Sequence, residues 1–252
     1  MSKPTRRKLI TAGLSTAGGV SALAVAAKLA DRYGLIPPDC GGIYGPGETL
    51  TYVAQRLLGR HSMAREFPRS AISQPPHANG KPPQDEAYLR LQAGGFADWR
   101  LVIDGLVARP AVFSLAELKS FPSRSQITHQ ACEEGWSSIA EWTGVPLSHV
   151  LNLVGVRPQA RYAVFFTIQR RWWGSVDLDD AFHPQTLLAY GINGGDLPPG
   201  RGGPLRLRVP RQLAYKSLKY ITNLKLTDSV KDIGNGLGAS STKGGYSWYA
   251  GI

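Results

Sequence analysis

The chain has 252 residues, of which 42% are hydrophobic and 19% charged, a composition that excludes a disordered protein and leaves ample material for a core. Its 29 glycines and 18 prolines imply many turns, which favours a mixed or β-rich architecture over a helix bundle. The net charge of +11 falls to +6 without residues 1–30. The sequence has no basic stripe interleaved with aromatic residues, so a nucleic-acid partner is disfavoured.

Residues 1–30 are predicted to direct export. Thr5-Arg6-Arg7-Lys8-Leu9-Ile10 is similar to a twin-arginine signal, and residues 9–27 that follow carry no charge. Because this route carries folded proteins, typically those that receive a cofactor first, we expect recognition by the export machinery and a periplasmic protein. The alternative is an uncleaved membrane anchor, since the uncharged run approaches a spanning length.

Residues 31–95 are expected to form an irregular arm. A short amphipathic helix is predicted over Glu48–Leu58, and the prolines and glycine between residues 75 and 83 exclude a regular element there. The isoleucine, phenylalanine and methionine content of residues 62–73 predicts that the arm packs on the domain that follows, over residues 96–252.

Within residues 96–252, strand-like and helical patterns follow one another without regular alternation, which predicts an α+β fold in one domain. Ser114 with Glu117 three residues later has the capping-box spacing and predicts the start of a short helix. The other predicted helices are Leu147–Val154, Leu178–Phe182 and His183–Leu188. The predicted strands are Trp99–Val107, Ser125–His129, Tyr162–Ile168, Pro204–Pro210 and Tyr220–Leu226.

Cys132 lies among polar and acidic residues in His-Gln-Ala-Cys-Glu-Glu, whereas a cysteine kept for packing is usually surrounded by apolar residues. A buried structural cysteine in a turn is the alternative. With five His, two Cys and no paired ligand spacing, a zinc site is disfavoured. A single thiolate instead suggests a metal whose other ligands come from a cofactor. Cys40 lies in a flexible Pro-Pro-Asp-Cys-Gly-Gly linker, so we expect no disulfide.

Two basic clusters could bind phosphate. Arg201 and Arg206 lie in and after a Gly/Pro-rich stretch whose backbone can approach a ligand closely. Lys216 and Lys219 flank Ser217, a combination that suits a phosphate dianion. Solvated arginines after a turn and a solvated lysine pair are the alternatives.

The segment Gln169–Ser175 combines two arginines with two tryptophans at the end of an apolar strand. Arg170, Arg171, Trp172 and Trp173 could line an anion-selective pocket, or form a surface loop with one buried tryptophan.

Together these segments resemble the sulfite oxidase-type molybdopterin-binding oxidoreductase family, in family order and spacing across about 96–228. The resemblance is closest to bacterial exported single-domain members, such as the catalytic subunit of the periplasmic methionine sulfoxide reductase. It is carried by His-Gln-Ala-Cys-Glu-Glu-Gly-Trp-Ser, Glu-Trp-Thr-Gly-Val-Pro-Leu, Phe-His-Pro-Gln-Thr-Leu-Leu-Ala-Tyr-Gly, Gly-Gly-Pro-Leu-Arg-Leu-Arg-Val-Pro and Tyr-Lys-Ser-Leu-Lys-Tyr-Ile.

The resemblance implies an α+β fold that holds one molybdenum with one molybdopterin, and it assigns roles by position. Cys132 would be the thiolate on molybdenum, and Arg201 stands where reductase relatives have Asn. The residues expected to contact the cofactor are Glu66, Cys132, Thr167, Arg201, Arg206, Lys216, Ser217, Leu218 and Lys219. Near the metal, Arg170 and Arg171 would favour an anionic substrate such as sulfite, whereas Trp172 or Trp173 would favour a thioether or sulfoxide.

The resulting hypothesis is oxygen-atom transfer to or from a small, sulfur-containing substrate. With no haem motif in the sequence, electrons would pass to a separate cytochrome, either a membrane b-type or a soluble c-type protein. Two alternatives are a non-catalytic protein of this fold that binds a ligand or partner, and a phosphate-binding module. The retained Cys132 argues against the first, and neither Cys132 nor the export signal is explained by the second.

Overall fold

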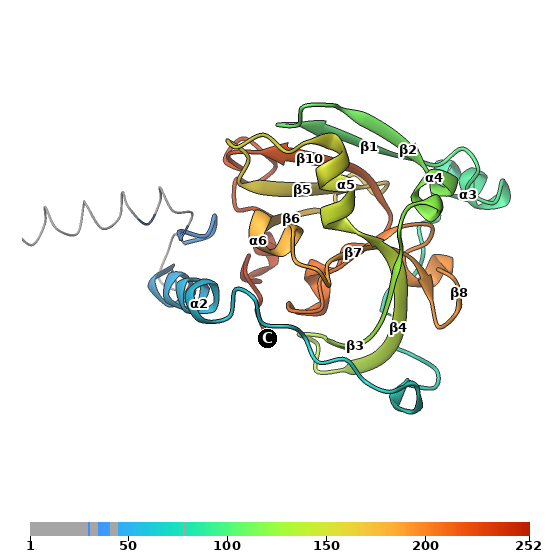
Figure 1. The fold of residues 1–252 in the computed structure, drawn as a ribbon, viewed down its shortest axis with the longest axis horizontal. Coiled ribbons are helices and arrows are strands. Elements are labelled where there is room, and N and C mark those ends of the chain that lie inside the picture. Colours follow the sequence, from blue (N-terminus) through green and yellow to red (C-terminus); the bar gives the residue numbers. More distant parts are fainter. Residues whose placement is uncertain (1–29, 31–34, 41–44, 78) are drawn as a thin grey trace, which may run out of the picture.

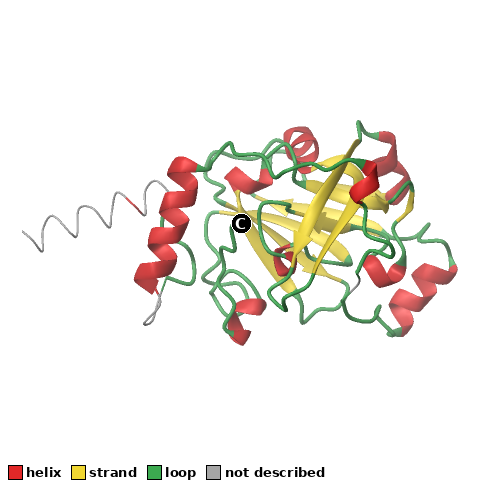
Figure 2. Cartoon of the chain, turned by 90° about the horizontal axis from the view of Figure 1, so that it is seen from below, coloured by secondary structure: helices red, strands yellow, loops and turns green. Residues whose placement is uncertain are grey.

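The computed structural model describes residues 30, 35–40, 45–77 and 79–252. The predicted signal lies almost entirely outside the described residues. Two sheets dominate the fold and are flanked by short helices (Figures 1 and 2). Among the described residues, no helix is both long and apolar enough to cross a membrane.

The first sheet has five strands in the order β2-β1-β10-β5-β6. Its strands are β1 (Arg100–Gly105), β2 (Ala111–Ser114), β5 (Tyr162–Thr167), β6 (Trp173–Asp177) and β10 (Ile221–Thr227). The pairing of β1 with β10 is parallel, and the other pairings are antiparallel. Strands far apart in the sequence therefore lie side by side at the centre of this sheet.

The second sheet has the order β3-β4-β7-β8, with β9 paired to β7. Its strands are β3 (Arg124–Ala131), β4 (Ser137–Pro146), β7 (Leu187–Ile192), β8 (Gly195–Asp196) and β9 (Arg206–Arg208). All of these pairings are antiparallel. The chain leaves β3 through the turn that contains Cys132 and returns as β4.

The described helices are α2 (Gly45–Leu58), α3 (Glu86–Ala93), α4 (Leu115–Ser120), α5 (Leu147–Val154) and α6 (Leu178–Ala181), with four short 3₁₀ turns. The helix predicted at the arm is confirmed as α2. The capping box is also confirmed, because the Ser114 hydroxyl accepts a hydrogen bond from the Glu117 N–H while the Glu117 carboxylate accepts from the Ser114 N–H.

The helix predicted over His183–Leu188 is wrong. Residues 183–186 form a turn, and Leu187 begins strand β7. Every residue of β7 is buried, because Leu188 and Tyr190 face the main core while Leu187 and Ala189 pack in a smaller apolar group with Trp142. The sequence of a strand that is buried on both faces is a continuous apolar run. It lacks the alternation of apolar and polar residues that would distinguish the strand from a short buried helix.

The main core lies between the sheets. Leu101 and Ile103 of β1 pack there with Val145 of β4 and with Val150 and Leu151 of α5. A second apolar cluster on the opposite face of the first sheet joins Tyr52 of α2 to Trp173 and Trp248, among others. This arrangement confirms the expected α+β class, with helices on a mainly antiparallel scaffold.

Part of the arm packs on the second sheet. The Phe67 N–H donates to the Ile127 carbonyl at 2.9 Å, and the Ser73 N–H donates to the Ile139 carbonyl at 2.9 Å. Helix α3 at the end of this segment was not predicted. The division at residue 96 stays a prediction.

Helix α2 is fixed to the domain by a buried network of charges. The Arg56 guanidinium bonds to Asp177 at 2.7 Å and to Asp180 at 2.6 Å, and the Tyr52 hydroxyl donates to Asp177 at 2.6 Å. These acidic residues lie at the end of β6 and in α6. A buried ion pair with several hydrogen bonds fixes the orientation of the helix that carries it.

Candidate active site

A cavity of about 580 Å³ opens where the two sheets, the arm and the C-terminal segment meet. Most of the predicted site residues line it: Cys132, Thr167, Arg171, Trp173, Arg201, Arg206, Lys216, Ser217, Leu218 and Lys219. They come from the ends of β3, β5 and β6 and from the segments around β9. The fold therefore brings together residues that lie up to 87 positions apart.

Cys132 lies directly after β3, at the start of a turn closed by the bond from the Gly135 N–H to the Cys132 carbonyl at 3.1 Å. Gly135 has φ of 87°, a conformation that glycine adopts without strain. Burial raises the pKa of the Cys132 thiol to about 11, and the carboxylates of Glu133 and Glu134 act in the same direction. The thiol is therefore protonated at neutral pH unless a positive charge, such as a metal ion, stabilises the thiolate.

Arg206 and Arg208 form a buried cationic pair beside the cavity. Their guanidinium groups lie 4.9 Å and 5.6 Å from the ring centre of Trp142, in cation–π geometry. Burial lowers the pKa of Arg206 to about 10 and that of Arg208 to about 9. Their side chains bond to the carbonyls of Ser217 and His129, while both Nε atoms lack a partner.

Arg201 and Lys219 extend this positive cluster. Burial, together with the positive charges of the neighbouring Arg206 and Arg201, lowers the pKa of Lys219 to about 8. The Lys219 ammonium bonds to the carbonyls of Asn79 and Gly200, and Arg201 bonds to carbonyls of the arm. Within the described ranges, no carboxylate forms an ion pair with any of the four cations of this cluster.

The donor set of the cavity fits a polar, anionic group. Buried cations without carboxylate partners favour an anion, and phosphate binds well to arginine forks. Two further polar atoms of the wall are buried without partners, the Gln130 Oε1 acceptor and the Trp142 Nε1 donor. A ligand with both donors and acceptors, such as a pterin, would satisfy them.

Lys216 lines the cavity, but its ammonium is occupied elsewhere. It donates to the Ser175 carbonyl at 2.8 Å and to the Trp248 carbonyl, and it lies 4.9 Å from the Trp248 ring centre. Burial lowers its pKa to about 8. The Ser217 hydroxyl accepts from the Val209 N–H at 3.1 Å. Lys216 therefore ties the C-terminal segment to β6, and only its neighbours remain to contact a phosphate.

Two predicted residues lie outside the cavity wall. The Glu66 carboxylate bonds to Arg124 at 2.6 Å and to Gln185 at 3.1 Å, and Arg170 is exposed. Trp173 is buried in the second apolar cluster and contributes to the wall from there. Trp172 is 45% exposed at the wall, with the Arg171 guanidinium 5.6 Å from its ring centre. The catalytic roles given to these residues stay predictions.

Several wall residues were not predicted. His77 of the arm lies with its ring centre 4.2 Å from that of Trp136, and Tyr215 lies 5.1 Å from Tyr246. They meet through contacts between distant segments, which local patterns do not reveal. Arg208, which lies beside the wall, could have been found from the sequence, because it follows Arg206 by two residues and so shares its face of the predicted strand.

The fold and the cavity define a molybdopterin-binding domain, and comparison with known proteins places the chain in that family. Residues 89–233 match the family model of the oxidoreductase molybdopterin binding domain. The chain is 35% identical over 195 residues to the putative protein-methionine-sulfoxide reductase subunit YedZ1 of Azospira oryzae, a match that covers 77% of this chain and 70% of that protein.

The structure is also similar to the crystal structure of the sulfane dehydrogenase SoxCD from Paracoccus pantotrophus. The TM-score is 0.50 at 26% identity, over 54% of this chain and 40% of that chain. The chain thus belongs to the molybdopterin-binding oxidoreductases and has the sulfite oxidase-type fold. It is an enzyme of that class rather than a non-catalytic relative.

Proposed function

We propose that this oxidoreductase transfers an oxygen atom to or from the sulfur of a small substrate, using one molybdenum held by one molybdopterin. The observation that carries the proposal is the position of Cys132 in the wall of a cavity that also holds unpaired buried cations. A thiolate suits the metal, and the cations suit the cofactor's phosphate.

The residues of the cavity would divide the work of binding. Cys132 would supply the thiolate ligand, and Arg206 and Lys219 would neutralise the phosphate from the cavity wall. Arg208, which lies beside the wall, would add to the positive charge, and Trp142 would donate a hydrogen bond from Nε1. When bound, the metal would supply the reversible two-electron chemistry that oxygen-atom transfer to or from the substrate requires. The aromatic wall around Trp136 and Trp172 would exclude water from the sulfur centre and contact its apolar substituents.

A sulfoxide or thioether fits this wall better than a compact anion such as sulfite. Arg170 is exposed and outside the cavity, and the Arg171 guanidinium lies over Trp172 rather than standing alone. Trp136 and Trp172 line the cavity and offer aromatic contact to an apolar group. Reduction of a sulfoxide to a thioether consumes two electrons and two protons and releases water.

An electron donor or acceptor is therefore needed, and a separate cytochrome, either membrane b-type or soluble c-type, is the partner that we propose. The names of the two relatives, a reductase subunit and a dehydrogenase, support an electron-transfer partner in general terms. The Arg6-Arg7 pair and the uncharged residues 9–27 support export of the folded, loaded protein to the periplasm.

The test is to purify the protein from a host that makes the cofactor and to measure molybdenum, released pterin and turnover of sulfite and sulfoxides. We expect about one metal and one pterin per chain. The Cys132→Ala variant should stay folded and lose turnover, whereas Cys40→Ala should keep it. Full turnover by Cys132→Ala, or folded wild-type protein without metal and pterin, would refute the proposal.

A further inference from the structure

The outward face of α2 is apolar and has no charged side chain. Leu50, Leu57 and Leu58 are 70%, 68% and 88% exposed, and Ala54 lies between them on the same face. Their spacing of four, seven and eight residues places them in one stripe along the helix. Large apolar side chains gathered in this way usually mark a surface that contacts something else.

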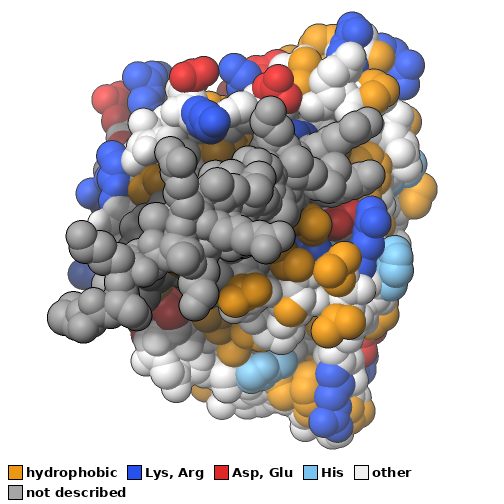
Figure 3. All heavy atoms as spheres, turned by 90° about the vertical axis from the view of Figure 1, so that its left-hand side faces the viewer, with side chains coloured by type: hydrophobic (Ala, Val, Ile, Leu, Met, Phe, Trp, Pro, Cys, Tyr) orange, Lys and Arg blue, Asp and Glu red, His pale blue; other side chains and the backbone are white. Residues whose placement is uncertain are grey.

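The helix cannot turn to bury this stripe. Its opposite face holds Tyr52 and Arg56, which are 3% and 5% exposed and bonded to buried carboxylates. Rotation would break these bonds, leaving Asp177 buried without an ion-pair partner among the described residues and Asp180 with only Arg211 at 3.6 Å. Figure 3 views the side on which α2 lies and shows hydrophobic side chains gathered beside the residues drawn in grey.

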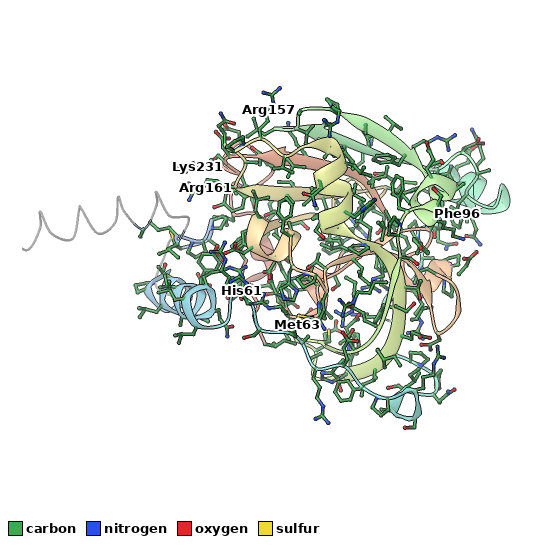
Figure 4. The ribbon with its side chains drawn as sticks, in the orientation of Figure 1. His61, Met63, Phe96, Arg157, Arg161 and Lys231 are labelled. Atoms are coloured by element: carbon green, nitrogen blue, oxygen red, sulfur yellow. The ribbon has the colours of Figure 1, made fainter. Side chains whose placement is uncertain are left out.

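The segment that follows α2 adds one more exposed apolar side chain. Met63, 51% exposed, lies with His61 on this segment (Figure 4). Between them and the helix lies Arg60, whose side chain is 58% exposed and pairs with Asp179. Apolar residues next to a cation are compatible with the interface of a lipid bilayer, whose headgroup layer accepts basic side chains.

The sequence before α2 shows what could cover the stripe. Residues 9–27 carry no charge, and the chain enters the fold beside α2, where Pro37 and Asp39 line a hollow with Glu48 and Thr51. The ten residues from 27 to 37 span at most about 35 Å when fully extended. If residues 9–27 lie in a membrane, α2 is held within that distance of its surface.

We propose that α2 docks on the surface of a lipid bilayer, with Leu50, Ala54, Leu57 and Leu58 in the interfacial layer. Three leucines alone give weak, reversible binding, so the uncharged N-terminal run acts as the second attachment. The Ser247 hydroxyl bonds to Glu48 of α2 at 3.0 Å, and the adjacent Tyr246 lines the cavity. Docking would therefore hold one wall of the cavity close to the membrane.

The test uses the full chain in vesicles of phosphatidylcholine and phosphatidylglycerol with brominated acyl chains. A fluorescent amino acid replaces Ala54, and in a control protein it replaces Val112, which is 56% exposed on β2. Bromine quenches only on close approach, so we expect strong quenching at position 54 and little at position 112. Equal quenching at the two positions, or none at 54, would overturn the proposal.

A pair of triple variants tests the stripe itself. Leu50→Gln, Leu57→Gln and Leu58→Gln keep helix propensity but remove the apolar side chains, so quenching at position 54 should fall to the level at Val112. The matched control replaces Leu89, Val112 and Leu153, which are also exposed, with glutamine. Quenching at position 54 should be unchanged in this control. Unchanged quenching in the first triple variant would contradict docking. A lipid-free control uses a water-soluble quencher instead. If the probe at position 54 becomes less accessible to that quencher as the protein concentration rises, the face contacts a second copy of the chain, and the proposal is overturned.

Discussion

Replacing Arg56 with methionine removes the cation that two buried carboxylates share. The Arg56 side chain is 3% exposed, and its partners Asp177 and Asp180 are 10% and 0% exposed in their side chains. Breaking a buried pair by removing one partner costs about 3–5 kcal/mol, because the remaining charge loses its compensation. In a chain of this length, 4 kcal/mol corresponds to a fall in Tm of about 8–16 °C.

The assay is thermal unfolding followed by circular dichroism, with Arg60→Met as the matched control. Arg60 lies just after the same helix and pairs with Asp179 at 2.7 Å, but its side chain is 58% exposed. An exposed pair contributes about 0–1 kcal/mol, so the control should lose at most about 4 °C. Similar losses for the two variants would refute the assignment of Arg56 as the fixing residue of α2.

The deficit of Arg56→Met should also depend on pH. Burial raises the pKa of Asp177, Asp180 raises it further, and Arg56 opposes both, so removing Arg56 raises this pKa again. A carboxyl group whose folded pKa is raised destabilises the fold once the pH exceeds its unfolded value, near 3.9. The difference in Tm between wild type and variant should therefore be largest near pH 8 and shrink toward pH 4. A deficit that grows on acidification would contradict this reasoning.

Two further predictions concern the cavity. Arg206→Met should lower the pterin content of purified protein while leaving the cofactor-free chain as stable or more stable, because a buried cation without a carboxylate partner is removed. The control Arg170→Met, at an exposed position, should change neither pterin content nor stability. Normal pterin content in Arg206→Met would contradict the phosphate role. Gly234→Ala should destabilise the protein more than Gly245→Ala. Both glycines have positive φ, but only at Gly234 would the new methyl lie 2.3 Å from the Trp173 ring; equal losses of Tm would show that Trp173 can move.

The sequence predicted the elements that depend on local interactions. The capping box of Ser114 and the amphipathic spacing of α5 lie within a few residues, so each segment contains its own signal. Strand β7 was missed because both of its faces are buried. Strand β4 was missed as well, and its burial pattern likewise lacks strict alternation.

The candidate site shows the same limit. Cys132 was singled out because a polar setting for a thiol is unusual, and Arg206 because it follows a Gly/Pro-rich stretch; both line the cavity. The orientation of the Lys216 side chain was not predicted, because its ammonium donates a hydrogen bond to the carbonyl of Trp248, 32 residues later in the sequence. The contribution of His77 required knowing that the arm crosses the domain.

The parallel pairing of β1 with β10 has a consequence for folding. Val102 lies opposite Asn223 in this ladder, so the centre of the first sheet closes a loop of about 120 residues. During synthesis, β1 and β5 both expose an unpaired edge until residues 221–227 are available. Contacts of such high sequence separation slow folding, and open edges invite pairing with other chains. Interruption of synthesis before residue 221 should therefore give an aggregating product rather than a smaller folded one.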